Sequence, residues 1–133
     1  MKRLAILAIA SAVTLFAAGV ASAHHSFAVF FDPEKSVTVT GKVTSFRFTN
    51  PHGTLSIDVT KADGTVEQWR AETNAPVILA RRGWTRNSVK PGETVTISGW
   101  PARDGRNYLR LMEAKDANGK LIGSAPFGRQ DQS

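Results

Sequence analysis

The sequence predicts a mainly β protein: a small barrel of five antiparallel strands with one short helix between the third and fourth strands. Five segments alternate apolar and polar residues with the period of a strand, and turn-forming Gly, Pro and Asp residues separate them. The segment after the third strand has helical spacing instead. The first strand changes phase near its middle, as the sharply coiled strands of closed barrels do.

Residues 1–23 are predicted to be a signal peptide. The segment opens with the basic pair "KR", continues as an uncharged apolar run and ends in Ala21-Ser22-Ala23, small residues that suit a signal peptidase. An uncleaved membrane anchor is the alternative, because Leu4 to Ala23 spans 20 residues. We expect cleavage between Ala23 and His24, and a periplasmic or secreted product that leaves the membrane.

Cleavage would leave 110 residues with 15 basic and 11 acidic side chains, a formal charge of +4. That length suits one domain, predicted over residues 24–123, followed by a loose tail over 124–133. The charge is compatible with an anionic partner, but export argues against nucleic acid. The chain has no cysteine, which excludes disulfides, thiolate metal sites and cysteine nucleophiles. The sequence carries no signal for an oligomeric state.

Three strands are predicted in the first half of the mature chain. The first runs from Val37 to Phe48, with a glycine inside it and a phase slip near Thr44-Ser45. The loop "TNPHGT" ends it, and Leu55 to Val59 and Val66 to Ala71 follow as a hairpin around "KADGT". In front of them, Phe27 to Phe31 is predicted as an extra strand-like segment that turns back through "DPEK" to pair with the first strand.

A short helix is predicted after the third strand. Asn74 is expected to cap it, Pro76 to lie in its first turn and Gly83 to end it. A fourth strand follows the turn at "KPG", and Tyr108 to Ala114 forms the fifth. This order of elements is that of an OB-fold, a Greek-key barrel. An open antiparallel sheet crossed by one helix is the alternative.

The histidines His24, His25 and His52 are the candidate metal ligands. After cleavage, His24 would carry a free α-amine that can chelate a metal ion together with its imidazole, and His25 would add a second imidazole. Nitrogen donors without sulfur suit Cu(II), Ni(II) or Zn(II), and Cu(II) generally binds most tightly. The alternative is that the pair serves processing and binds copper only incidentally, as any exposed terminal His-His would.

His52 is an optional third donor whose distance from the N-terminus depends on strand pairing. If the segment in front pairs with the first strand, Phe31 opposes Ser36 and His24 opposes Val43. His52 then lies nine residues further along, roughly 30 Å on a straight strand. We therefore expect His52 to be remote from His24, unless the strand coils strongly or the N-terminal segment crosses the barrel.

A second candidate site would bind an anionic or peptide ligand through Asn50, His52, Arg82, Trp84 and Arg86. The first two lie in the loop between the first two strands, which OB-folds use for ligands, and the others follow the helix. The alternative is that these residues serve as turn, core and solvated helix end. No catalytic motif is present: the carboxylates are scattered, and the chain has no nucleophile elbow or phosphate loop.

Four segments, "AHHSF", "FD", "VTGKVTSFRFTNPH" and "RRGWTRNSVKPGE", together resemble a domain-of-unknown-function family of small proteins exported by Gram-negative bacteria. The resemblance covers His24 to about Ala114. It implies an exported domain with the same histidines at corresponding positions, and it implies no activity. The order of strands and helix is also similar to that of periplasmic OB-fold proteins, a likeness at the level of fold alone.

The sequence therefore predicts an exported binding protein without catalytic residues, whose ligand is a divalent metal ion such as Cu(II) held by the N-terminal histidines. An adaptor for an anionic or peptide ligand is the alternative. A copper-dependent oxidative enzyme is a third hypothesis, which requires all three histidines within coordinating distance of one ion.

Overall fold

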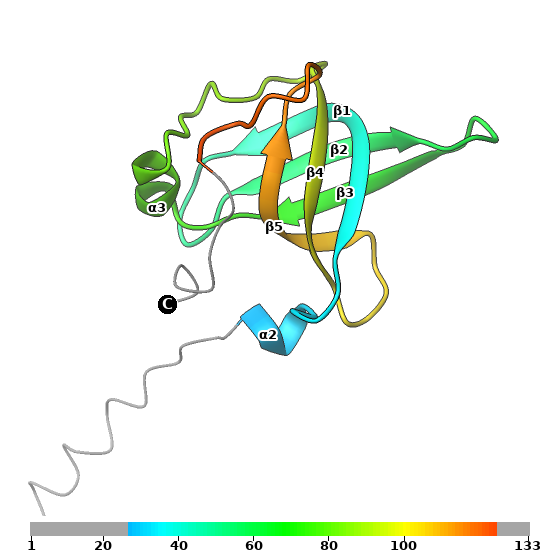
Figure 1. Ribbon diagram of the computed structural model, residues 1–133, viewed down its shortest axis with the longest axis horizontal. Coiled ribbons are helices and arrows are strands. Elements are labelled where there is room, and N and C mark those ends of the chain that lie inside the picture. The colour runs from blue at the N-terminus through cyan, green and yellow to red at the C-terminus, as the bar shows by residue number, and fades with distance from the viewer. Residues whose placement is uncertain (1–26, 125–133) are drawn as a thin grey trace, which may run out of the picture.

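Strands with alternating burial close into a barrel in the order β1-β2-β3-β5-β4 (Figure 1). The computed structural model describes residues 27–124. Within that range the elements are α2 (Phe27–Phe30), β1 (Val37–Arg47), β2 (Thr54–Thr60), β3 (Val66–Glu72), α3 (Pro76–Arg81), β4 (Thr94–Pro101) and β5 (Tyr108–Lys115). The predicted OB-type barrel is confirmed, and the open sheet is not. One pairing departs from the prediction, because β3 and β5 run parallel.

The barrel interior is filled by the inward-facing apolar residues of every strand, with Leu79 of α3 and Trp84 among them. The buried members of this core are Val43, Leu55, Ile57, Ala71, Leu79, Trp84, Val89, Val95, Ile97, Leu109, Leu111 and Ala114. Full burial of a Leu, Ile or Val side chain contributes about 1.5–3 kcal/mol. In the absence of disulfides, this packing is the principal source of stability.

Two irregularities in strand pairing coil the strands enough to close the barrel. The register of β1 on β2 shifts between Val43 and Ser45, where the sequence predicts a phase slip. The register of β4 on β5 shifts between Ser98 and Gly99. A Cβ atom at Gly99 would collide with the backbone oxygen of Arg110, so only glycine allows the two backbones to approach this closely.

The segment in front of β1 folds differently from its prediction. Phe27–Phe30 forms one helical turn, and Phe31 pairs with Ala102 instead of Ser36. Phe27 and Phe31 are four residues apart, so a helical turn places both rings on one face, and both are buried. The backbone nitrogen of Asp32 donates to the oxygen of Pro101 over 2.9 Å, which ties this segment to the end of β4.

The helix between β3 and β4 is present, but Asn74 does not cap it. The N-cap is Ala75, which makes no side-chain capping bond, and Pro76 occupies the first turn as predicted. Asn74 is buried, and its Oδ1 accepts a hydrogen bond from Arg110 Nη2 over 2.6 Å. Gly83, at φ +82°, follows the last helical turn where the sequence predicts the end of the helix.

The predicted signal peptide, His24, His25 and residues 125–133 of the predicted tail lie outside the described residues. Within residues 27–124, neither helix has the length and apolar character needed to cross a membrane.

Candidate functional site

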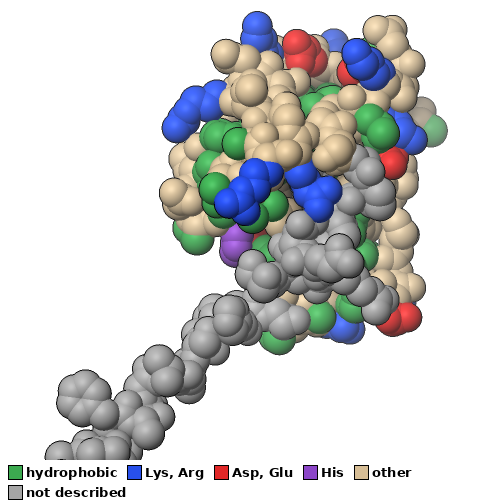
Figure 2. Space-filling view, turned by 60° about the vertical axis from the view of Figure 1, so that its left-hand side comes forward, with side chains coloured by type: hydrophobic (Ala, Val, Ile, Leu, Met, Phe, Trp, Pro, Cys, Tyr) green, Lys and Arg blue, Asp and Glu red, His purple; other side chains and the backbone are tan. Residues whose placement is uncertain are grey.

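A pocket of about 340 Å³ lies between α2 and the ends of β3 and β5. Its apolar wall consists mainly of aromatic rings, those of Phe27, Phe30, Phe31 and Tyr108. Its polar wall contains His52 and Glu72, with Asp104 and Arg106 also among its lining residues. Figure 1 shows α2 below one end of the barrel, and Figure 2 shows histidine surface beside hydrophobic side chains. An apolar cavity with a few convergent polar groups is typical of a ligand site.

Glu72 connects His52 and Tyr108 across the polar wall. Glu72 ends β3 and Tyr108 begins β5, and the parallel pairing of these strands brings them together. The Tyr108 hydroxyl donates to Glu72 Oε2, while Glu72 Oε1 lies 2.7 Å from His52 Nδ1. Because a carboxylate can only accept, Nδ1 carries a proton in this contact, and Nε2 of a neutral His52 then holds the lone pair.

The loop that carries His52 is held against the strand end by its backbone. The nitrogen of Gly53 donates to the oxygen of Asn74 over 3.2 Å, and the nitrogen of Thr73 donates back to Gly53 over 2.9 Å. A Cβ atom at Gly53 would lie 2.5 Å from Thr73 Oγ1, so the residue after His52 has to be small. These contacts fix the imidazole next to Glu72.

The phenol of Tyr108 is partly buried and hydrogen-bonded to Glu72. Burial is the main cause that raises its pKa above the usual value of 10, and the hydrogen bond to Glu72 raises it further. The guanidinium groups of Arg70 and Arg106, which lie 5.5 Å and 5.7 Å from the ring centroid, act in the opposite direction. Tyr108 is therefore a neutral hydrogen-bond donor at physiological pH.

Ultraviolet titration tests this environment directly, because Tyr108 is the one tyrosine of the sequence. We expect tyrosinate absorbance to appear well above pH 10 in the folded protein and at about pH 10 in concentrated urea. Since folding raises the pKa, the corresponding stability is present below about pH 10 and is lost as the pH rises through the folded pKa. Tyr108→Phe is the blank, and a folded midpoint near pH 10 would contradict the buried contact with Glu72.

Arg110 does not line the pocket but contacts two of its lining residues, Glu72 and Phe27. Its side chain is buried, donates from Nη1 to the backbone oxygen of Glu72 over 3.1 Å, and lies 3.8 Å from the ring centroid of Phe27. Phe27 also lies against His52, with 4.9 Å between the ring centroids. Phe27, the first residue that the structure describes, thus lies against both Arg110 and the candidate ligand His52.

The other predicted ligand residues do not join His52 in this pocket. Trp84 is 1% exposed and packs on Phe46, so its ring offers no face to a ligand; its assignment to the binding surface is corrected to the core. Arg86 is exposed and lies over the ring of Phe48 at 5.7 Å. Asn50 is exposed in the loop before His52, and Arg82 is half-buried after α3; neither lines the pocket.

Glu72, Tyr108 and Arg110, which hold the site together, are not among the ligand residues that the sequence predicts. One signal was available for Arg110, a charged residue inside the apolar run "YLRLM" of the fifth strand. A charge in such a run is buried only with partners, and those of Arg110 come from the end of β3 and from α2.

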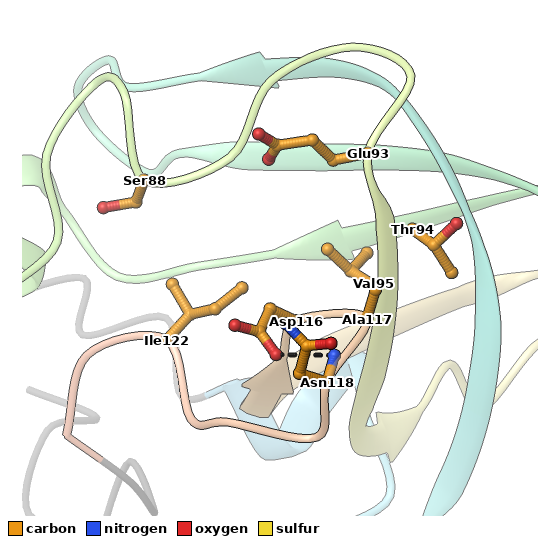
Figure 3. A pocket seen from close by; sticks show the side chains of 8 residues that line it. All are labelled: Ser88, Glu93, Thr94, Val95, Asp116, Ala117, Asn118 and Ile122. Atoms are coloured by element: carbon orange, nitrogen blue, oxygen red, sulfur yellow. Dashed lines mark hydrogen bonds between the residues drawn. The ribbon is translucent and has the colours of Figure 1, made fainter.

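A further pocket of about 360 Å³, at the start of β4, contains two carboxylates (Figure 3). Asp116 Oδ1 accepts from the backbone nitrogens of Asn118 and Lys120, and Glu93 Oε2 accepts from that of Lys90, so both serve local turns. Across residues 27–124, no three His, Cys, Asp or Glu side chains lie close enough together to hold a metal ion.

Taken together, strand order, helix position and pocket define an OB-type barrel with an aromatic pocket at one end. The chain belongs to the family of unknown function DUF6152, whose family model matches residues 12–109. The predicted resemblance to a domain-of-unknown-function family is thereby confirmed. No curated protein matches the chain.

Solved structures with a similar shape include Rim1, a mitochondrial single-stranded DNA binding protein from S. cerevisiae, at 13% identity and a TM-score of 0.48. The match covers 68% of this chain and 97% of that one. A small single-stranded DNA-binding protein from Streptomyces coelicolor matches at 13% identity and a TM-score of 0.39, covering 62% and 90%. TiaS, in a complex with a tRNA and ATP, matches at 15% identity and 0.46, covering 65% of this chain but 19% of that chain. At this level the likeness concerns the fold alone.

Proposed function

We propose that the exported, mature protein binds a divalent metal ion, with Cu(II) held most tightly, through His24, His25 and His52. The observation that supports this proposal is the contact between Phe27 and His52, whose ring centroids are 4.9 Å apart. The predicted pairing of this segment with the first strand, which would separate His24 from His52 by roughly 30 Å, does not form.

The length of chain between the histidines allows them to meet. His25 and His24 precede Phe27 by two and three residues. Consecutive Cα atoms are 3.8 Å apart, so the Cα of His24 lies within about 11 Å of that of Phe27. The side chains of His24 and His52 add further reach. A site formed by His24, His25 and His52 therefore does not require the N-terminal segment to cross the barrel.

The environment of His52 suits a metal ligand. Glu72 holds Nδ1 at 2.7 Å, and metal-binding histidines commonly donate their second nitrogen to a carboxylate in this way. The side chain of His52 is 39% exposed, so part of the imidazole is open to solvent. An all-nitrogen donor set that combines imidazoles with an α-amine favours Cu(II) among common divalent ions. Deprotonating that amine at neutral pH costs only about 1 kcal/mol.

Calorimetric copper titration tests the proposal with three proteins: residues 24–133, the same chain with one extra N-terminal residue, and His52→Ala. We expect each change to weaken binding by about tenfold or more, which corresponds to about 1.4 kcal/mol or more per lost ligand. Equal affinity of the extended chain would remove the α-amine from the site, and equal affinity of His52→Ala would remove His52. The intact mass of the exported protein shows whether His24 is the first residue.

A further inference from the structure

A third cavity, a groove of about 300 Å³, lies on the outer surface of β1, β2 and β3. Its lining residues are all polar or charged: Ser45, Arg47, Thr54, Ser56, Gln68 and Arg70. The three strands lie side by side in Figure 1. The groove shares no residue with the aromatic pocket at the barrel end or with the predicted metal ligands. The two cavities touch at one place, where Arg70 of the groove lies over the ring of Tyr108.

The register of the strands places the two arginines on either side of the hydroxyl groups. Ser56 in the middle strand lies between Ser45 on β1 and Arg70 on β3, and Thr54 pairs with Arg47 in the next row. These side chains share the outer face, because the residues that alternate with them face inward: Leu55, Ile57 and Ala71 are buried and Trp69 is half-buried. β1 and β3 are two strand spacings apart, about 10 Å, so long side chains from both reach the space above β2.

The positive charge of this groove is not neutralised locally. Within residues 27–124, neither Arg47 nor Arg70 forms an ion pair. Glu72, the next residue on this face of β3, directs its carboxylate to His52 and Tyr108. Asp58 does not line the groove; it lies between Lys42 on β1 and Gln68 on β3. Two guanidinium groups therefore face a surface of hydroxyls with no carboxylate paired to them.

We propose that this groove binds a small sugar that carries a phosphate or sulfate ester. Guanidinium groups match the oxygens of a tetrahedral anion through paired, charge-assisted hydrogen bonds. The hydroxyls of Ser45, Thr54 and Ser56 both donate and accept, as sugar hydroxyls require. No aromatic side chain is among the described residues that line the groove, whereas binding of single-stranded nucleic acid relies on aromatic stacking.

The test is a calorimetric titration with glucose 6-phosphate in the presence of a metal chelator, which keeps it independent of the copper proposal. We expect Arg47→Ala and Arg70→Ala each to weaken binding by about tenfold or more, since each removes charge-assisted hydrogen bonds. Arg81→Ala is the matched control, because it deletes the same charge from an exposed position on α3 and should bind like wild type. Glucose 6-sulfate should bind comparably, and unmodified glucose should not bind.

Four results would overturn the proposal. These are no binding of glucose 6-phosphate at millimolar concentration, equal weakening by Arg81→Ala, inorganic phosphate binding as tightly as the sugar ester, or a thymidine oligonucleotide binding more tightly than either. The second result indicates diffuse attraction, the third a plain oxyanion site and the fourth a nucleic-acid surface. Arg47 and Arg70 are exposed, so thermal unfolding should show that both variants fold normally.

Discussion

Phe31→Ala will lower the free energy of unfolding by about 3–5 kcal/mol, the range for a large aromatic ring deleted from a core. The side chain is 1% exposed and lies between two other rings, 6.3 Å from Phe27 and 5.1 Å from Tyr108. Its removal takes away the burial energy of the ring and leaves a cavity under α2. Urea denaturation followed by tryptophan fluorescence measures the change.

Phe30→Ala is the control, because it deletes the same ring from the adjacent residue. Phe30 is 57% exposed, so we expect a change in unfolding free energy of about 0.5 kcal/mol or less. The contrast between the neighbours depends on α2 packing with Phe31 inward and Phe30 outward, and it would disappear if the segment packed elsewhere. Similar losses in both variants would contradict the position of α2.

Glu72→Gln will weaken copper binding by about 10- to 100-fold, the usual effect of losing the carboxylate that orients a metal-bound histidine. Glutamine keeps the size of the side chain, but His52 and Tyr108 contact different oxygens of Glu72, and one of these positions becomes an NH2 donor in glutamine. It also removes the negative charge that makes the His52 imidazole a better donor. Competition against a copper chelator at neutral pH measures the loss.

Glu67→Gln is the matched control for this change. It lies on the same strand, and its carboxylate contacts Lys61 Nζ at 3.0 Å, on the exposed hairpin. It makes the same change in charge, so a general electrostatic effect on Cu(II) would appear in both variants. Equal affinity of the two variants would exclude an orienting role for Glu72, whereas a selective loss in Glu72→Gln would support one.

The barrel was predictable because its strands alternate cleanly and its turns carry Asp-Gly or Pro-Gly. The shift between Val43 and Ser45 could also be recognised, since a phase slip in an apolar pattern is visible in the sequence. The structure of the segment in front of β1 was not predictable. The spacing of Phe27 and Phe31 places them on one face of a strand and equally on one face of a helical turn. Phe31 pairs with Ala102, a contact distant in the sequence that a five-residue pattern does not encode.

The pocket was only partly predictable. His52 stands out as a histidine in a loop, but its partners come from a parallel contact between β3 and β5, whose paired residues are 38 positions apart. Asn74 shows the same limit. Its position before the helix favours a cap, yet the buried guanidinium of Arg110 offers its amide oxygen a charge-assisted bond. Such long-range competition decides contacts that local patterns leave open.

The attachment of α2 to the barrel has a practical consequence for preparing the protein. The backbone nitrogen of Arg103 donates to the backbone oxygen of Phe30 over 2.9 Å, and Arg103 Nε donates to the backbone oxygen of Ala28 over 2.9 Å. These bonds fix the start of the described chain beside His52. An affinity handle fused just ahead of it would begin at the mouth of the aromatic pocket. A polyhistidine handle there would bring foreign imidazoles into reach of His52 and contribute its own metal affinity, so purification handles belong at the carboxyl end.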